Sequence, residues 1–285
     1  MRYPLAFAVL ATLLTVACGL ERDIELALPE YEPQPAVEAY LTPGEPFRML
    51  VTRTSGFFDP LEIDSSRFLE NLLYEDLRVV IRYGDEEVVL PNRPSLDFDN
   101  VLAYNYTSDA VVPANYTDSF YLELTLPDGR SSTAATKLLP PVPIDSSVVE
   151  YRDPLDADSL ARIFTYITDP DPDRVNRFRR LLTYAPVDSS ELQDFVFTDE
   201  QSDQPSIPVG TIYYFSPGDT IYIYNAHVDE AFEKYLFSVQ LAEQSNGNPF
   251  AQPSTLLSNL SGEANATGIF TSYAYVVDTV IVPEP

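Results

Sequence analysis

Three aspartates, Asp169, Asp171 and Asp173, alternate with prolines and form a candidate set of metal ligands. Carboxylate oxygens at alternating positions of a loop are ligands that calcium prefers, so this pattern predicts a calcium site. An EF-hand-type loop that starts at Asp169 would need glycine at its sixth position and glutamate at its twelfth, where this chain has Arg174 and Arg180. Arginines compete with a bound cation. The alternative, which we favour, is an acidic turn that pairs with the neighbouring arginines.

Catalytic chemistry has few other candidates. His227 is the one histidine in the chain, and neither a Gly-x-Ser-x-Gly nor a His-Glu-x-x-His motif is present. The 44 acidic residues allow some carboxylate pair of the kind that glycosidases use, but no spacing singles one out. We therefore predict no catalytic residues and no enzymatic activity, and we expect His227 on the surface at the start of a helix.

Tyrosines are concentrated in two predicted strands, 211–215 and 220–226, as Tyr213, Tyr214, Tyr222 and Tyr224. A tyrosine has a large apolar face and a polar hydroxyl group, which suits stacking on a carbohydrate or binding of a peptide. Because successive residues of a strand face opposite sides, about half of them must face a core. We favour core packing over a binding surface.

The one cysteine, Cys18, stands where an apolar segment ends and charged residues begin. Arg2 precedes the almost wholly apolar residues 5–16, as in a secretory signal peptide. This segment is shorter than the roughly 20 residues that a membrane-spanning helix needs. The small residue before Cys18 resembles the lipobox of bacterial lipoproteins, which implies cleavage before Cys18 and its acylation, for example with palmitate. We expect a signal peptide at 1–17 and a lipid-anchored tether at 18–35. The alternative is an ordinary secreted protein with an unmodified cysteine.

Composition limits the partners and the fold. The formal net charge of −27 repels nucleic acid and anionic lipid head groups, so we predict no nucleic-acid partner. Hydrophobic residues make up 45 % of the chain, which suffices for a packed core. The 19 tyrosines and 16 phenylalanines, together with 25 prolines, favour strands separated by turns.

The elements that would position these residues are mostly strands. Alternating apolar and polar positions over 36–139 predict a β-sandwich of immunoglobulin-like or transthyretin-like type. The proline-rich residues 140–146 predict a linker. Residues 147–285 predict a second β-rich domain, whose last strand is expected at 268–282. Apolar residues at helical spacing predict one long amphipathic helix at about 227–244. The predicted fold class is therefore mainly β, with two β-sandwich-like domains, the second of which carries the helix.

Several phrases in a fixed order also resemble one family: IELALPEYEP (24–33), VEAYLTPGEP (37–46), TRTSGFFDPL (52–61), NPFAQPSTLLSNLSG (248–262) and ATGIFTSYA (266–274). The family comprises uncharacterised lipoproteins from Bacteroidota and is known as domain of unknown function four-two-four-nine. The resemblance covers nearly all of the chain after Cys18. It implies a location in the cell envelope. Genes of the family often lie near those of TonB-dependent outer-membrane transporters, which implies such a transporter as a partner. The resemblance supplies no catalytic residues.

Together these observations predict an outer-membrane lipoprotein, anchored by lipid, on the periplasmic face or the cell surface. We expect a non-enzymatic accessory component that binds a ligand or another envelope protein. One alternative is an envelope hydrolase that uses a carboxylate pair. The other is a calcium-dependent adhesion module, in which calcium would be the one cofactor.

Overall fold

The computed structural model describes residues 31–55, 72–97, 102–156, 158–185, 191–200, 204–245 and 255–285. The chain divides into two units, Met1–Glu32 and Pro33–Pro285, and the elements described here belong to the second unit. The predicted signal peptide, Cys18 and most of the predicted tether lie outside the described residues.

Among the described residues, eight strands precede the proline-rich segment: β1 (Pro35–Leu41), β2 (Pro46–Arg53), β3 (Arg78–Tyr83), β4 (Glu86–Leu90), β5 (Asn92–Asp97), β6 (Leu102–Val111), β7 (Ser119–Thr125) and β8 (Ser131–Lys137). The described elements that follow it are β9 (Ser146–Tyr151), β10 (Ala161–Thr168), β11 (Arg177–Thr183), β12 (Gln193–Thr198), β13 (Ser206–Gly210), β14 (Thr220–Val228), α3 (Glu230–Ser245), β15 (Ser261–Gly262), β16 (Thr267–Ser272) and β17 (Ala274–Ile281). The described part of the chain is thus mainly β with a long helix late in the sequence, which confirms the predicted fold class.

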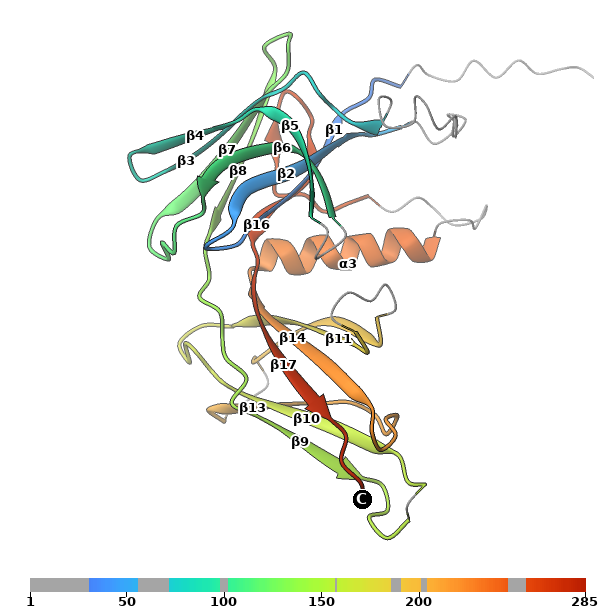
Figure 1. Ribbon diagram of the computed structural model, residues 1–285. Coiled ribbons are helices and arrows are strands. Elements are labelled where there is room, and N and C mark those ends of the chain that lie inside the picture. Colours follow the sequence, from blue (N-terminus) through green and yellow to red (C-terminus); the bar gives the residue numbers. More distant parts are fainter. Residues whose placement is uncertain are drawn as a thin grey trace, which may run out of the picture. The chain divides into compact units, whose positions relative to one another are not determined.

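Two five-stranded sheets form the first sandwich-like packing. Their strand orders are β16-β1-β2-β6-β5 and β15-β8-β7-β3-β4 (Figure 1). In β7, Phe120, Leu122 and Leu124 are buried, whereas Tyr121 between them is exposed, as the alternation predicted. The same pattern in β1 and β2 brings apolar side chains of both sheets into one core.

The first sandwich is completed by strands from late in the sequence. β16 pairs in parallel with β1, and β15 pairs with β8. Gly268 permits the close approach of β16, because it has a φ of +111° and a Cβ atom there would lie 2.0 Å from the carbonyl oxygen of Val37. The prediction that 147–285 forms one second domain is therefore wrong for these two strands. Alternation indicates a strand, but it does not indicate the partner of that strand.

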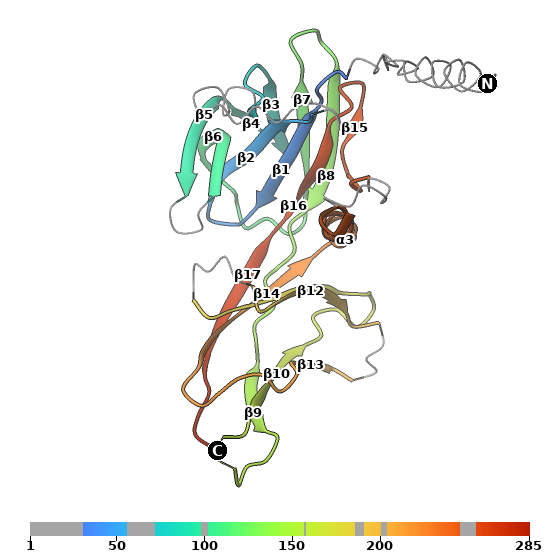
Figure 2. The ribbon, with the colours of Figure 1, turned by 90° about the vertical axis from the view of Figure 1, so that its right-hand side faces the viewer.

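A second sandwich-like packing has the strand orders β13-β10-β9 and β12-β11-β14-β17. Its core contains mainly branched aliphatic residues of β10, β14 and β17, including Ile163, Ile221, Ile223 and Val280. β14 and β17 run side by side in antiparallel register (Figures 1 and 2).

The strand predicted at 268–282 is divided between the two sandwiches. β16 ends at Ser272 in the first sandwich, and β17 begins at Ala274 in the second. Tyr273, between them, donates its amide to the carbonyl oxygen of Leu41 at 2.9 Å. The strand predicted at 211–215 is also wrong, because this segment contributes only one isolated bridge, between Phe215 and Ala161.

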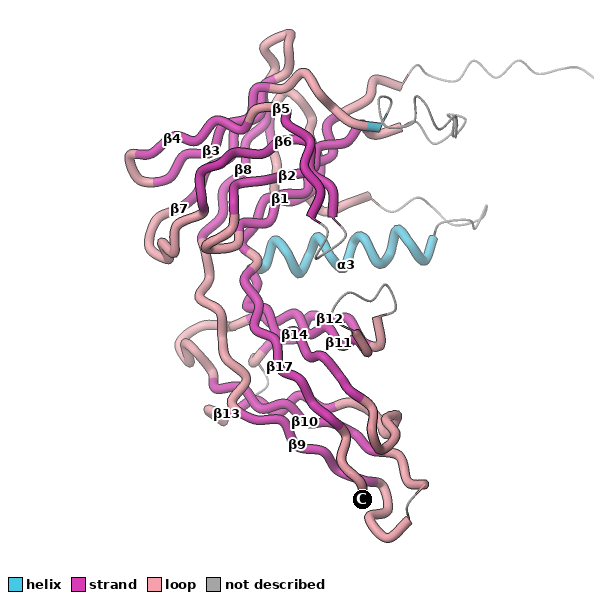
Figure 3. Tube along the Cα trace, viewed as in Figure 1, coloured by secondary structure: helices cyan, strands magenta, loops and turns pink. Residues whose placement is uncertain are grey.

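The predicted helix is confirmed, with a later start. β14 continues to Val228, and Asp229 then caps α3, because its Oδ1 accepts the amide of Phe232 at 2.7 Å. Phe232 and Tyr235 are buried on the inner side of the helix, which lies against β16. Figure 3 shows α3 in cyan among the magenta strands.

The proline-rich segment between β8 and β9 contains no strand or helix, and its side chains and backbone contact both neighbours. Val142 is buried, and its carbonyl oxygen accepts from Nδ2 of Asn225 at 3.3 Å. The amide of Leu139 donates to Oγ of Ser272 at 3.1 Å. These contacts attach the predicted linker to both sandwiches.

Candidate functional site

The outer face of the sheet β12-β11-β14-β17 carries tyrosines that do not face a core. In β14 the sequence Thr-Ile-Tyr-Ile-Tyr places Ile221 and Ile223 in the core, so Tyr222 and Tyr224 lie on the opposite face and are half-buried. The preference for core packing of these tyrosines is therefore wrong. Tyr213 and Tyr214 also lie outside the core, and Tyr214 is 53 % exposed.

β17 extends this surface with aromatic and aliphatic side chains. Tyr224 is opposite Val277 in the register, and Thr220 is opposite Ile281. Tyr275, Val277 and Ile281 are 40 %, 48 % and 67 % exposed. We refer to Tyr222, Tyr224, Tyr275, Val277 and Ile281 as the tyrosine face.

The rings of Tyr224 and Tyr275 lie 5.5 Å apart in an edge-to-face arrangement. Burial raises the pKa of Tyr224, and the neighbouring Tyr275 and Tyr222 raise it further. At neutral pH the hydroxyl group of Tyr224 is therefore protonated.

A partly buried ion pair lies beside the tyrosine face. Arg179 donates from Nε and from a terminal nitrogen to the two carboxylate oxygens of Asp194, at 2.7 and 2.8 Å. Its other terminal nitrogen donates to the hydroxyl oxygen of Tyr273 at 3.1 Å. Burial works to lower the pKa of Arg179, but the hydrogen bonds and charge of Asp194 outweigh it and raise the pKa.

Aromatic stacking continues from this pair toward the open surface. The ring of Tyr273 stacks on Phe232 at 5.5 Å and lies 6.0 Å from the ring of Tyr275. Tyr275 is therefore held by neighbours on both sides, since it also contacts Tyr224. Side chains that are ordered before binding lose less entropy when a partner binds.

The tyrosine face provides contact area and hydrogen-bond donors, but no nucleophile with a base. The one acidic side chain on β14 and β17 is Asp278, on the other face of the sheet from the tyrosines. Its carboxylate accepts from Oγ of Ser147 at 2.6 Å and from the amide of Thr279 at 2.9 Å. Large apolar rings with polar hydroxyl groups are suited to binding.

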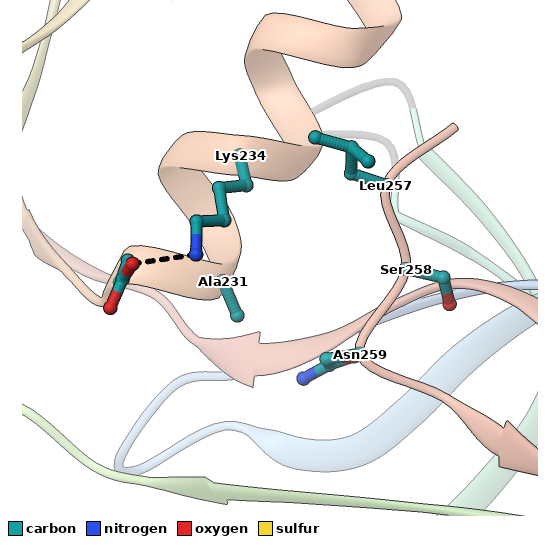
Figure 4. Close-up of a pocket in the computed structure, with 6 residues that line it drawn as sticks. Ala231, Lys234, Leu257, Ser258 and Asn259 are labelled. Carbon is teal, nitrogen blue, oxygen red and sulfur yellow. Dashed lines mark ion pairs between the residues drawn. The ribbon is translucent and has the colours of Figure 1, made fainter. Parts of the chain in front are cut away.

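Two shallow hollows lie elsewhere on the described surface. One, of about 350 Å³, lies between α3 and the segment before β15. Figure 4 shows Lys234 there, paired with Glu230 at 2.6 Å. The side chain of Asn259 in this hollow bonds both the carbonyl oxygen and the amide of Phe270, at 2.7 and 3.0 Å. These polar groups are thus already engaged within the protein.

The second hollow, of about 430 Å³, lies over β7 and β8. Arg82 on its floor pairs with Glu123 at 2.7 Å and with Glu87 at 2.9 Å. Here too, charged side chains satisfy one another.

The aspartates of the predicted calcium site bind their own turn. Oδ1 of Asp169 accepts from the amide of Asp171 and from Nδ2 of Asn176, at 3.0 and 2.9 Å. Oδ1 of Asp171 accepts from the amide of Asp173, and its other oxygen pairs with Arg174 at 3.3 Å. Across the described ranges, no three histidine, cysteine, aspartate or glutamate side chains have the geometry of a metal site. This arrangement matches the alternative of an acidic turn.

His227 is buried in β14, so its expected place on the surface at a helix start is wrong. Its Nδ1 lies 3.2 Å from the carbonyl oxygen of Pro140, and its ring stacks on Phe178 at 5.3 Å. Because a carbonyl oxygen only accepts, Nδ1 carries the proton. Burial lowers the pKa of His227, so the ring is neutral at pH 7. It attaches the proline-rich segment to the second sandwich.

For a carboxylate pair of the kind that glycosidases use, the structure offers Glu38 as one member. Burial raises the pKa of Glu38, as a general acid requires. Burial raises the pKa values of the neighbouring Tyr40 and Tyr235, and the charge of Glu38 raises them further. Within the described residues, no second carboxylate contributes to the raised pKa of Glu38.

The comparisons with known proteins leave the resemblance as a prediction. Neither the models of protein families nor the curated proteins give a match to this chain. Within the described ranges, no helix has both the length and the apolar character needed to cross a bilayer.

Proposed function

We propose that this protein is a lipid-anchored component of the outer membrane that binds another envelope protein and catalyses no reaction. The observation that carries the proposal is the tyrosine face, in which five half-buried or exposed aromatic and aliphatic side chains lie on the opposite side of the sheet from the core residues Ile221, Ile223 and Val280. Tyrosines are enriched among the residues that dominate protein–protein binding. In the two hollows, the charged side chains Lys234 and Arg82 are already paired with glutamates, which favours the tyrosine face as the binding surface.

The anchor and the partner rest on the sequence. The segment before Cys18 supports acylation at that cysteine, and two or more fatty chains hold a protein firmly on a membrane. The resemblance to the Bacteroidota lipoproteins supports a TonB-dependent transporter as the partner.

Replacement of Cys18 with serine tests the anchor. The unaltered protein should incorporate radiolabelled palmitate and sediment with membranes, whereas Cys18→Ser should do neither. Absence of label from the unaltered protein would contradict this part of the proposal.

Affinity capture from detergent-solubilised envelopes tests the binding. The double variant Tyr224→Ala/Tyr275→Ala should reduce recovery of the transporter by roughly 30-fold or more, because truncation of a central tyrosine costs about 2 kcal/mol. Tyr121→Ala is the matched control, because Tyr121 is a 55 % exposed strand tyrosine of the first sandwich. Equal recovery with the double variant and the control would contradict the use of this face.

A further inference from the structure

The edge strands of the four sheets differ in their protection. An exposed edge presents unpaired backbone groups, and proteins usually block it with proline, charge, bulges, short length or a covering element. β5 contains Pro94 and a register shift, β13 contains Pro208, and β15 has two residues. β4 begins with the charged pair Glu86 and Glu87. These four edges are each protected by a recognisable feature.

Three further edges are covered or carry paired charges. β16 is almost wholly buried and lies against α3 and β8. In β12, Asp194 is bound by Arg179, and in β9, Glu150 accepts from Arg162 at 2.8 Å.

β17 has the least protection among these edges, because its one charged residue is Asp278, which bonds Ser147 and the amide of Thr279. It pairs with β14 over eight residues without a register shift, and it contains no proline, glycine, lysine or arginine. In the described ranges no strand pairs with its other edge. A long, regular and mostly apolar edge is the kind to which an added strand can pair.

The hydrogen bonds at the end of β17 show which backbone groups face outward. Val282 bonds toward the β14 side with both its groups: its amide donates to Asp219 and its carbonyl oxygen accepts from Gly218, each at 2.9 Å. Because these directions alternate along an antiparallel strand, the groups of 275, 277, 279 and 281 face the open edge. The amide of Thr279 donates to the side chain of Asp278, so that in the described part of the chain three outward amides remain, those of 275, 277 and 281.

We propose that the open edge of β17 pairs with an extended strand of a partner protein, and that basic residues flank this strand. The inference rests on the proposed binding function and names how the partner would be held. Side chains of the added strand would pack beside Tyr275, Val277 and Ile281, which lie on the same face.

Charge selects this occupant over a second copy of the chain. β14 and β17 contain no lysine or arginine, and the acidic residues Asp219, Asp278 and Glu284 lie in or next to the two strands. A second copy would bring another net charge of −27, which repels, whereas a strand with basic ends is attracted.

Hydrogen exchange on the full-length lipoprotein in detergent tests the pairing. The probe is the peptide Lys-Lys-Val-Thr-Val-Thr-Val-Lys-Lys, and its control carries glutamates in place of the lysines. The lysine peptide should slow exchange of the amides in 275–281, and the glutamate peptide should bind at least about tenfold more weakly at low salt.

Two variants at one position separate backbone pairing from side-chain packing. Val277→Pro removes an outward amide without removing a bond to β14, so peptide affinity should fall by about tenfold or more. Val277→Ala keeps the amide, so the loss should stay within about threefold. Melting temperatures show whether both variants fold. If Val277→Pro does not fold, hydrogen exchange of the unaltered protein with the two peptides still tests the pairing.

The outcomes are separable. Absence of protection by the lysine peptide, equal losses in the two variants, or protection that appears with rising protein concentration alone would overturn the inference. If Tyr224→Ala/Tyr275→Ala prevents transporter capture but Val277→Pro does not, the proposed function stands and the strand pairing fails.

Discussion

Arg180 lies in the core of the second sandwich without a carboxylate among its hydrogen-bond partners. It is 1 % exposed, and its terminal nitrogens donate to the carbonyl oxygen of Val209 at 3.0 Å and to Oγ1 of Thr165 at 2.9 Å. Its Nε has no hydrogen-bond partner in the described structure. We predict that Arg180→Met, which removes the charge and keeps most of the volume, lowers the free energy of unfolding by no more than about 3 kcal/mol.

The magnitude follows from two opposing effects. Burial lowers the pKa of Arg180 from its ordinary value to about 10. At neutral pH the side chain is charged in both the folded and the unfolded state, so this shift corresponds to roughly 3 kcal/mol that destabilise the folded state. Methionine removes this cost but leaves the two oxygen atoms without their donors, at about 1 to 3 kcal/mol each. The net change in free energy of unfolding should therefore lie between a gain of about 1 kcal/mol and a loss of about 3 kcal/mol.

Urea unfolding followed by circular dichroism measures these changes, and Thr165→Val supplies the matched comparison. In the unaltered protein this replacement removes an acceptor from Arg180 and should destabilise by about 1 to 3 kcal/mol. In the Arg180→Met background it removes an unsatisfied hydroxyl group and should stabilise by about 1 kcal/mol. The sign of the effect should therefore reverse between the two backgrounds.

Two results would refute this reasoning. A loss of more than about 4 kcal/mol in Arg180→Met would mean that the guanidinium group contributes more than its burial costs. An equal loss from Thr165→Val in both backgrounds would mean that the hydroxyl group acts independently of Arg180.

Three further predictions concern single positions. Folding lowers the pKa of His227 below its ordinary value of 6.5, so the unfolded state binds more protons than the folded state once the pH falls below about 6.5. The free energy of unfolding should therefore decrease on acidification below that pH. His227→Asn should make the urea midpoint less dependent on pH between pH 7 and 5. Asp229→Ala removes the cap of α3 and should lower the free energy of unfolding by about 1 kcal/mol in the same assay, with faster amide exchange in the first helical turn. Gly268→Ala should destabilise by roughly 3 kcal/mol or more in thermal melts, since its Cβ would collide with the backbone of Val37. Gly44→Ala is its control, where φ is also positive but no atom lies within 4 Å, so a loss nearer 1 kcal/mol is expected; equal losses would contradict the role of the close contact.

Part of the candidate site could be read from local sequence. The alternation in β14 shows that its isoleucines and tyrosines face opposite sides, and Ile221 and Ile223 are the more apolar set. The sequence gives no corresponding signal for the pair of Arg179 and Asp194, because its members lie on neighbouring strands. Their contact depends on the register of β11 and β12.

The amino-acid sequence by itself determined the mainly β character, most strands and the long helix, because these depend on periodicity within a few residues. The tertiary structure decided which strands pair, as when β16 joins β1 and β17 joins β14 on either side of Tyr273. It also decided that His227 is buried and that Tyr275 is exposed. The physical reason is that a period of two defines two faces of a strand, whereas only the packing of distant segments determines which face and which edge are covered.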